Sequence, residues 1–185
     1  FIVASGNNST TVMTHAGLAR YCFDFMGSNE EGRTTTLGTA DLGSNEDYYG
    51  FSMPVYSPVD GIVVSVVDDG VDHAPTNEWM YHLEGNHITI QDVNNYNYVF
   101  VHNKHHTALV KEGDRVTAGQ QIAELGNTAS TVPHLHFGVW SEDWTVSIPV
   151  RFSRYFEITV DGGHVDKIER TNAAPEQGKV IVNEE

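Results

Sequence analysis

The chain has 185 residues and is acidic, with 25 Asp and Glu against 10 Lys and Arg and a formal net charge of −15. Such a surface would repel nucleic-acid phosphates and anionic membranes, so a nucleic-acid partner and electrostatic adhesion to a membrane are both disfavoured. Hydrophobic residues make up 39% of the chain, which is typical of a globular domain with a sizeable core.

Short β-branched and aromatic runs recur along the chain, separated by Gly, Asp and Asn, and helical periodicity is hard to find. This pattern is typical of an all-β domain. The strands expected in chain order are Tyr21–Phe25, Val55–Tyr56, Gly61–Val67, His87–Asp92, Tyr98–His102, Arg115–Val116, Gln121–Leu125, His134–Trp140 and Val146–Phe152. A closing hairpin is predicted from Arg154–Val160 and His164–Glu169, because the Asp161-Gly162-Gly163 sequence between them favours a turn.

Two stretches, residues 26–50 and 68–86, are rich in Gly, Asn and acidic residues and predict long loops. Loops of this length in a compact domain are functional rims or disordered. The tail from Thr171 to Glu185 either adds an edge strand through Val180–Val182 or stays mobile. We expect one domain over residues 1–185, with a core at about 14–152 and a C-terminal hairpin and tail at 153–185.

Cysteine usage and hydropathy restrict the compartment only loosely. Cys22 is the only cysteine, so no intrachain disulfide is possible. No apolar stretch approaches the roughly 20 residues of a membrane span, and no signal peptide is visible. We therefore expect no membrane span, and the oligomeric state is left open.

The most informative motif is Pro133-His134-Leu135-His136-Phe137, within the predicted strand His134–Trp140. Residues i and i+2 of a strand point to the same face. The two imidazoles would therefore lie side by side, which suits one metal ligand beside one proton-handling group.

A catalytic zinc usually has three protein ligands and one open position for water. If His136 is one ligand, the best upstream partners are His15 and Asp24. Asp24 is an acid within an otherwise apolar strand, and a buried carboxylate needs a cation or metal beside it. The alternatives are that Asp24 accepts backbone hydrogen bonds at a turn and that His15 is a surface loop residue.

The chain resembles the lysostaphin-type (LytM-like) zinc metallopeptidases, the murein endopeptidase family, over roughly residues 14–140. The matching segments, in the family's order, are His15 to Asp24, Tyr56 to Val63, Tyr98 to His102, and Val110 to Ile122 followed by Gly126-Asn127-Thr128 and Pro133 to Phe137. The chain departs from the family in the eight residues between His15 and Asp24, in the long segment after Asp24, and in Ala129, where Gly is usual.

The resemblance implies folded antiparallel sheets, barrel-sandwich-like, with long loops around a metal groove. It implies that His15, Asp24 and His136 bind Zn²⁺ and that His102 and His134 are catalytic. The implied activity is zinc-dependent endopeptidase hydrolysis of peptide bonds in peptidoglycan through a metal-activated water, with peptidoglycan peptides as partners. The implied location is periplasmic or extracellular.

Other functions are also compatible with parts of the sequence. A catalytically silent binding or activator module on the same fold and a peptidase acting on non-wall peptides are the main alternatives. A biotinyl or lipoyl carrier domain would explain the Val110–Ile122 pattern, but it requires an exposed lysine at a tight hairpin and does not explain the histidines. His105 and His106 compete with His102 and are expected as loop residues. Trp79, Trp140 and Trp144 either edge a substrate groove or pack as core or rim residues.

Overall fold

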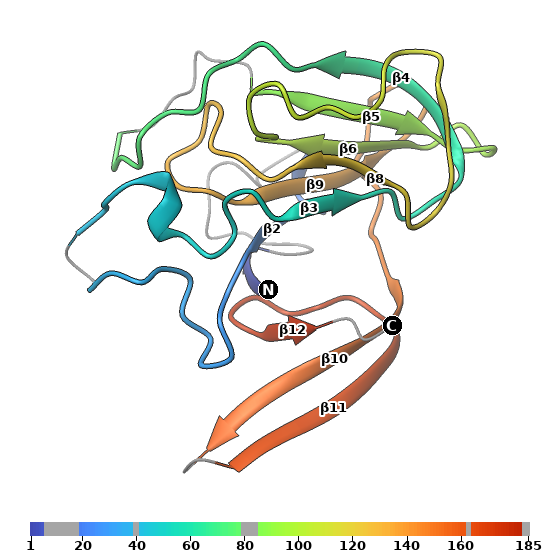
Figure 1. The fold of residues 1–185 in the computed structure, drawn as a ribbon. Helices are drawn as coiled ribbons and strands as arrows, with labels where there is room; N and C mark the ends of the chain where they lie inside the picture. Colours follow the sequence, from blue (N-terminus) through green and yellow to red (C-terminus); the bar gives the residue numbers. More distant parts are fainter. Residues whose placement is uncertain (6–18, 39–40, 79–84, 162–163, 183–185) are drawn as a thin grey trace.

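The computed structural model describes residues 1–5, 19–38, 41–78, 85–161 and 164–182. In these residues, twelve strands form two antiparallel sheets (Figure 1). The large sheet has the strand order β11-β10-β12-β1-β2-β9-β6-β5-β4-β7, and the small sheet pairs β3 with β8. The expected all-β class, with an antiparallel sheet folded over a smaller one, is confirmed.

The strand bounds follow the predicted segments closely in the middle of the chain. The large sheet contains β1 (Ile2–Ser5), β2 (Phe23–Met26), β4 (Gly61–Val67), β5 (His87–Gln91), β6 (Asn97–Val101), β7 (Arg115–Val116), β9 (Leu135–Trp140), β10 (Phe152–Asp161), β11 (His164–Ala173) and β12 (Val180–Val182). The small sheet contains β3 (Pro54–Tyr56) and β8 (Gln121–Glu124). A 3-10 turn covers Asn45–Asp47. None of the described segments is a helix long and apolar enough to cross a bilayer.

The prediction of a strand at Val146–Phe152 is wrong for most of its length. Only Ser147 forms an isolated bridge, to Trp140, and the next strand begins at Phe152. Pro149 lacks a backbone N–H and so cannot continue a hydrogen-bonded ladder. The tail does form a strand at Val180–Val182, but this strand is not at the edge of the sheet, because it pairs with β10 on one side and with β1 on the other.

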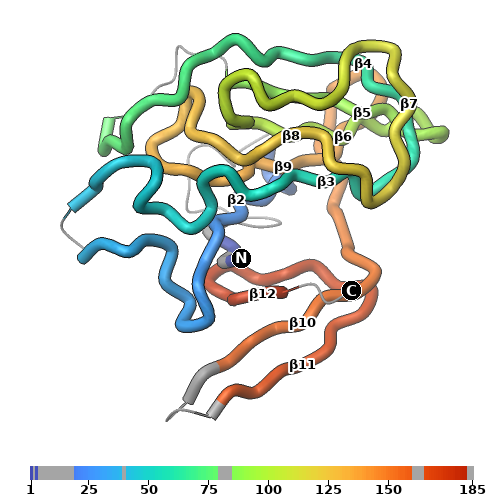
Figure 2. The backbone as a smooth tube through the Cα atoms, in the orientation of Figure 1, coloured from blue at the N-terminus to red at the C-terminus, as the bar shows by residue number. Residues whose placement is uncertain are grey.

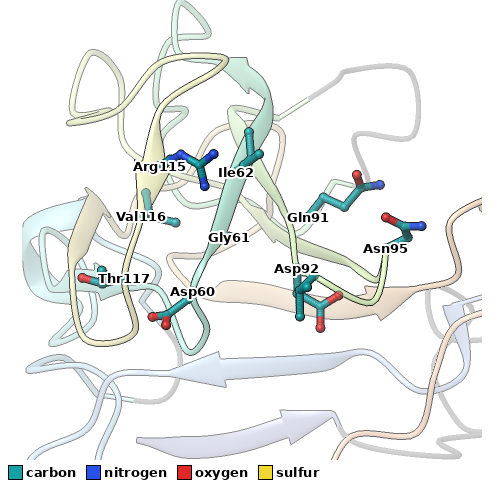
Figure 3. A pocket seen from close by; sticks show the side chains of 10 residues that line it. Asp60, Gly61, Ile62, Gln91, Asp92, Asn95, Arg115, Val116 and Thr117 are labelled. Carbon is teal, nitrogen blue, oxygen red and sulfur yellow. The ribbon is translucent and has the colours of Figure 1, made fainter.

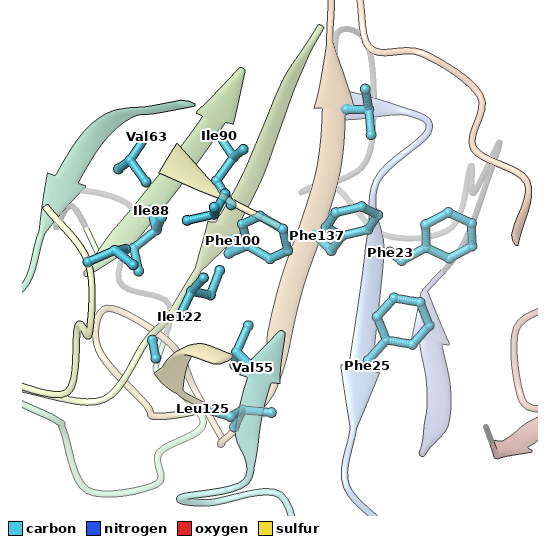
Figure 4. Packing of buried hydrophobic residues seen from close by; sticks show 14 of the residues in the cluster. Phe23, Phe25, Val55, Val63, Ile88, Ile90, Phe100, Ile122, Leu125 and Phe137 are labelled. Carbon is cyan, nitrogen blue, oxygen red and sulfur yellow. The ribbon is translucent and has the colours of Figure 1, made fainter. Parts of the chain in front are cut away.

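The core lies between the two sheets. Phe100 and Phe137 project from β6 and β9 of the large sheet toward Val55 and Ile122 of the small sheet, and Phe23 on the next strand, β2, extends the same cluster away from the small sheet (Figure 4). All five side chains are at most 4% exposed. Burying an aliphatic or aromatic side chain of this size stabilises a fold by about 1.5–3 kcal/mol, so this layer holds the strands of the large sheet in place.

Strand β9 lies between β2 and β6, and this placement determines what gathers on its outer face. Phe137 and Val139 face the core, so His136 faces the other side of the sheet. In the backbone register, Asp24 of β2 and Val101 of β6 are both opposite His136. The end of β6 and an acidic residue of β2 are therefore brought beside the His-x-His motif.

The C-terminal hairpin of β10 and β11 extends away from the body of the molecule (Figure 1). Its base is tied down by buried Glu157 of β10. The Glu157 carboxylate lies 2.8 Å from Nζ of Lys179 and 3.1 Å from Nε of Arg170 on β11. These ion pairs connect β10, β11 and the segment just before β12.

The chain makes long excursions between β2 and β3 and between β4 and β5 (Figure 2). In their described parts, these loops are anchored by side-chain amides. Asn45 Nδ2 donates to the carbonyl of His73 at 2.8 Å, and Asn127 Nδ2 donates to Asn45 Oδ1 at 2.9 Å. The two excursions are therefore joined to each other and to the Gly126-Asn127-Thr128 segment.

Candidate active site

Asp24 and His136 form the centre of the site. They face each other across the β2–β9 pair, and Oδ1 of Asp24 lies 2.9 Å from Nδ1 of His136. The Asp24 side chain is only 14% exposed, so this contact supplies the polar partner that a largely buried carboxylate requires. Asp24 lies within a strand rather than at a turn, unlike the alternative weighed from the sequence.

His134 immediately precedes β9, and its ring approaches the same oxygen of Asp24 that His136 contacts. Its Nδ1 lies 2.9 Å from the carbonyl oxygen of Val132, and its Nε2 lies 3.5 Å from Oδ1 of Asp24. Because a carbonyl can only accept, Nδ1 carries the hydrogen and Nε2 is the atom turned toward Asp24. Burial lowers the pKa of His134, but the hydrogen bond and charge of Asp24, with the Val132 carbonyl, raise the pKa overall above its usual value.

His102 completes the cluster from the end of β6. Its ring centre lies 4.7 Å from that of His134 and 6.1 Å from that of His136. Nδ1 donates to the carbonyl of Thr128 at 2.7 Å, which leaves Nε2 with the lone pair in the neutral ring. Burial, followed by the neighbouring His134 and His136, holds the pKa of His102 well below its usual value.

His102 also has an uncommon backbone conformation, with φ at 68°. A non-glycine residue pays a conformational cost in this left-handed region, and such residues often occur at functional sites. The strand predicted at Tyr98–His102 ends at Val101, and the turn at His102 directs the ring toward Thr128 and the cluster.

A buried network holds the Thr128 carbonyl in place. Thr128 Oγ1 accepts from the backbone N–H of Asn86 at 2.9 Å and donates to the carbonyl of Asn103 at 3.0 Å. Gly85 allows the close approach, because a Cβ there would lie 2.8 Å from the Thr128 oxygen and 3.0 Å from Nδ1 of His102. The segments at Asn86, Asn103 and Thr128 are thereby held together around the imidazole of His102.

The donor set of this cluster suits zinc. Carboxylate oxygens and imidazole nitrogens are zinc ligands, and two ligands of a tetrahedral zinc lie about 3.3 Å apart at ligand distances near 2.0–2.1 Å. The 2.9 Å between Asp24 and His136 is close to that spacing. His15, the third ligand expected from the sequence, lies outside the described residues, and within them no group of three or more His, Cys, Asp or Glu side chains is arranged to hold a metal.

The competing histidines that the structure describes lie elsewhere. The rings of His105 and His106 lie against each other at a tilt, with centres 3.8 Å apart, and Nδ1 of His105 contacts the carbonyl of Gly70 at 3.0 Å. His87 contacts Gly85 and Ser65. His102 is therefore the one of the three neighbouring histidines whose ring contacts the His-x-His pair.

Cys22 immediately precedes β2, two residues before Asp24, and is fully buried. Burial, followed by the charge of Asp24, raises the pKa of its thiol to about 12. At neutral pH the group is a thiol rather than a thiolate, so it is a poor metal ligand and behaves as a small buried apolar group.

A separate cavity of about 520 Å³ opens at the β4–β7 edge of the large sheet (Figure 3). Its lining includes Asp60, Ile62, Gln91, Asp92 and Arg115. No residue of the histidine cluster contributes to it, so the cavity and the cluster are distinct features.

Sequence reasoning missed the residues that orient the imidazoles. These are the carbonyls of Thr128 and Val132 and the hydroxyl of Ser130, which lies 3.0 Å from Nδ1 of His134. The Gly126-Asn127-Thr128 segment was part of the resemblance, but backbone carbonyls carry no residue-specific signal.

Comparison with known proteins identifies the family. The sequence profile of peptidase family M23 matches residues 48–148, which is more than half of the chain. The chain is 37% identical over 92 residues to the peptidoglycan DD-endopeptidase ShyA of Vibrio cholerae, an alignment covering 47% of this chain and 18% of ShyA. It is 38% identical over 68 residues to lipoprotein NlpD of Yersinia enterocolitica, covering 37% of this chain and 67% of NlpD.

Among solved structures, the fold is similar to a mutant catalytic domain of the prophage-encoded M23 protein EnpA from Enterococcus faecalis. The TM-score is 0.51 at 17% identity, over 80% of this chain and 85% of that one. The chain spans less than a quarter of the length of ShyA, so ShyA contains a large part without a counterpart here. The family match covers the β3–β9 region that carries His102, His134 and His136, and the chain belongs to peptidase family M23.

Proposed function

We propose that this chain is a zinc-dependent endopeptidase that hydrolyses peptide bonds in peptidoglycan at the cell envelope, in the periplasm or outside the cell. The single observation that carries the proposal is the convergence of Asp24, His136, His134 and His102 at one place on the large sheet. The activity in the name of ShyA supports the substrate class.

In this proposal, His15, Asp24 and His136 hold the zinc. Zinc at such a site supplies a water of lowered pKa and polarises the substrate carbonyl. Asp24 contributes the negative charge of the ligand set, and Nδ1 of His136 faces the Asp24 carboxylate. Both ligands described lie on strands, which hold geometry more rigidly than loops.

His102 and His134 are the proposed catalytic pair. Each ring has its Nδ1–H committed to a backbone carbonyl, which fixes the tautomer and leaves Nε2 for chemistry. An imidazole held in this way can take a proton from the attacking water, donate one to the leaving amine, or donate a hydrogen bond to the oxyanion. No side-chain nucleophile is needed for this reaction.

Metal analysis and three variants test the assignment. The purified chain should contain about one zinc, as a single three-ligand site requires. His136→Ala should lose the zinc, whereas His134→Ala should retain it and lose turnover. His106→Ala, an exposed ring outside the cluster, serves as the control and should retain both. Stoichiometric zinc in His136→Ala would refute the ligand assignment.

The substrate class is tested by mass spectrometry of products from purified peptidoglycan, digested with and without a chelator. Chelator-sensitive cleavage of a peptide bond is the expected outcome, and the products identify the bond. Binding without cleavage would instead favour a catalytically silent module on the same fold. Cleavage of non-wall peptides alone would overturn the peptidoglycan assignment.

A further inference from the structure

The outer face of β9 continues beyond the site. His136, Gly138 and Trp140 alternate with the core residues Phe137 and Val139, so all three point to the side of the sheet that carries the histidine cluster. At about 3.3 Å per residue, the backbone of Gly138 is about 7 Å from that of His136, and the backbone of Trp140 is about 13 Å from it.

The indole of Trp140 lies back over Gly138, in the direction of the cluster. A Cβ on residue 138 would lie 3.3 Å from Nε1 of Trp140 and 2.5 Å from Sγ of Cys22. A side chain at residue 138 would therefore collide with Cys22 and crowd Nε1 of Trp140, so the glycine leaves room for the polar edge of the indole. Nε1 of Trp140 therefore lies beside residue 138, which is two residues, or about 7 Å, along the strand from His136.

The indole N–H of Trp140 is a donor without an acceptor among the described residues. Trp140 is only partly buried, and its Nε1 is not one of the buried, unpartnered side-chain atoms of the described residues, so this atom is accessible to solvent. Because an indole can only donate, this edge of the site offers a hydrogen bond to a carbonyl oxygen.

A second indole stands beside the first. Trp144 is 47% exposed, and its ring centre lies 6.3 Å from that of Trp140. Its backbone has φ at 60°, in the left-handed region that a non-glycine residue rarely adopts. The turn around it is held by Asp143, which accepts hydrogen bonds from the hydroxyls of Ser141 at 2.7 Å and Thr145 at 2.8 Å. The turn is thus built to hold an exposed aromatic ring next to Trp140.

We propose that Gly138, Trp140 and Trp144 form a positioning subsite for the peptide substrate, next to the proposed metal site. Nε1–H of Trp140 donates to a main-chain carbonyl of the extended substrate, about two residues from the bond that is cut, since an extended peptide advances about 3.3 Å per residue. Trp144 covers the same part of the substrate. This inference rests on the proposed peptidase function and deepens it by assigning Gly138, Trp140 and Trp144 to substrate positioning.

Binding is tested in a His134→Ala background, which the proposed mechanism leaves able to bind but unable to cleave. The chain has three tryptophans and so gives three indole N–H signals in a ¹H–¹⁵N spectrum. Adding Trp140→Phe identifies the signal of Trp140. Titration with a soluble cross-linked muropeptide should move this signal downfield in a saturable manner, and Trp140→Phe should weaken binding about fivefold, the range for one neutral hydrogen bond.

In the active chain, Trp140→Phe should raise KM about fivefold and leave kcat within about twofold, because an aromatic side chain is kept at this position while the indole N–H is lost. Tyr56→Phe is the matched control, since Tyr56 is an aromatic residue that is 51% exposed on the small sheet, and it should change neither constant. Equal melting temperatures of the variants and the parent would exclude a folding defect.

The outcomes separate the two proposals. Muropeptide binding with an unmoved Trp140 signal, or with an unchanged affinity in Trp140→Phe, overturns the subsite and leaves the peptidase function standing. An absence of muropeptide binding by the His134→Ala parent overturns the substrate class and the subsite together.

Discussion

Adding one methyl group at Gly85 is expected to slow catalysis without removing the metal. The new Cβ would lie 2.8 Å from the carbonyl oxygen of Thr128 and 3.0 Å from Nδ1 of His102. Ordinary van der Waals contacts are several tenths of an ångström longer, so the Thr128 carbonyl or the His102 ring must move. The 2.7 Å hydrogen bond that orients His102 would then be lost.

The expected size follows from what that hydrogen bond controls. A positioned general acid or base contributes about 10²–10⁴-fold to the rate, so misplacing His102 should lower kcat by about 10–100-fold. Overpacking of this kind also costs about 1–3 kcal/mol in the free energy of unfolding. Zinc content should stay at the parent level, because His102 is not one of the proposed ligands.

The assay compares Gly85→Ala with Gly119→Ala by denaturant unfolding, metal analysis and steady-state hydrolysis of muropeptides. A Cβ on residue 119 meets nothing within 4 Å, but φ there is 83°. That substitution should therefore destabilise the chain by about 1 kcal/mol through backbone strain alone and leave kcat unchanged. If the two variants had the same kcat, Gly85 would have no role in orienting His102 and the reasoning would be refuted.

Three further predictions concern stability and reactivity. Ala129 has φ at 54°, so Ala129→Gly should raise the free energy of unfolding by about 0.5–1 kcal/mol in denaturant titration, and a loss would contradict strain there. Lys179, followed by Arg170, lowers the pKa of Glu157 below its usual 4.5. The ionised Glu157 carboxylate therefore stabilises the folded state above pH 4.5, and this stabilisation is lost as the pH falls through the lowered pKa of the folded state. The melting temperature of Glu157→Gln should accordingly fall less steeply with acidification than that of the parent, and parallel curves would contradict the linkage. Burial, followed by Asp24, raises the pKa of Cys22 to about 12, so a thiol reagent at mildly alkaline pH should label the native chain far more slowly than the unfolded chain, whereas equal rates would contradict this environment.

Local sequence patterns predicted most of the strands because turn residues and alternating apolar residues act over a few positions. The β4, β5, β8 and β9 segments and the closing hairpin follow directly from such patterns. The same reasoning failed at Val146–Phe152, where apolar residues pack onto the core without pairing as a strand. Periodicity reports burial, and burial does not require a hydrogen-bonded ladder.

The His-x-His motif and Asp24 could be identified as candidates from the sequence. Two histidines at i and i+2 of a strand point to one face, and a carboxylate buried in an apolar strand is unfavourable without a partner. Only the tertiary structure shows that Asp24 and the His-x-His motif lie together, because β2 and β9 are separated by more than 100 residues and become neighbours through long-range pairing. The choice of His102 over His105 and the orienting carbonyls of Thr128 and Val132 were likewise decided by tertiary packing. The sequence determines which side-chain groups are available. The direction of an imidazole depends on which backbone carbonyls pack against it, and the sequence does not distinguish these carbonyls because every residue type has one.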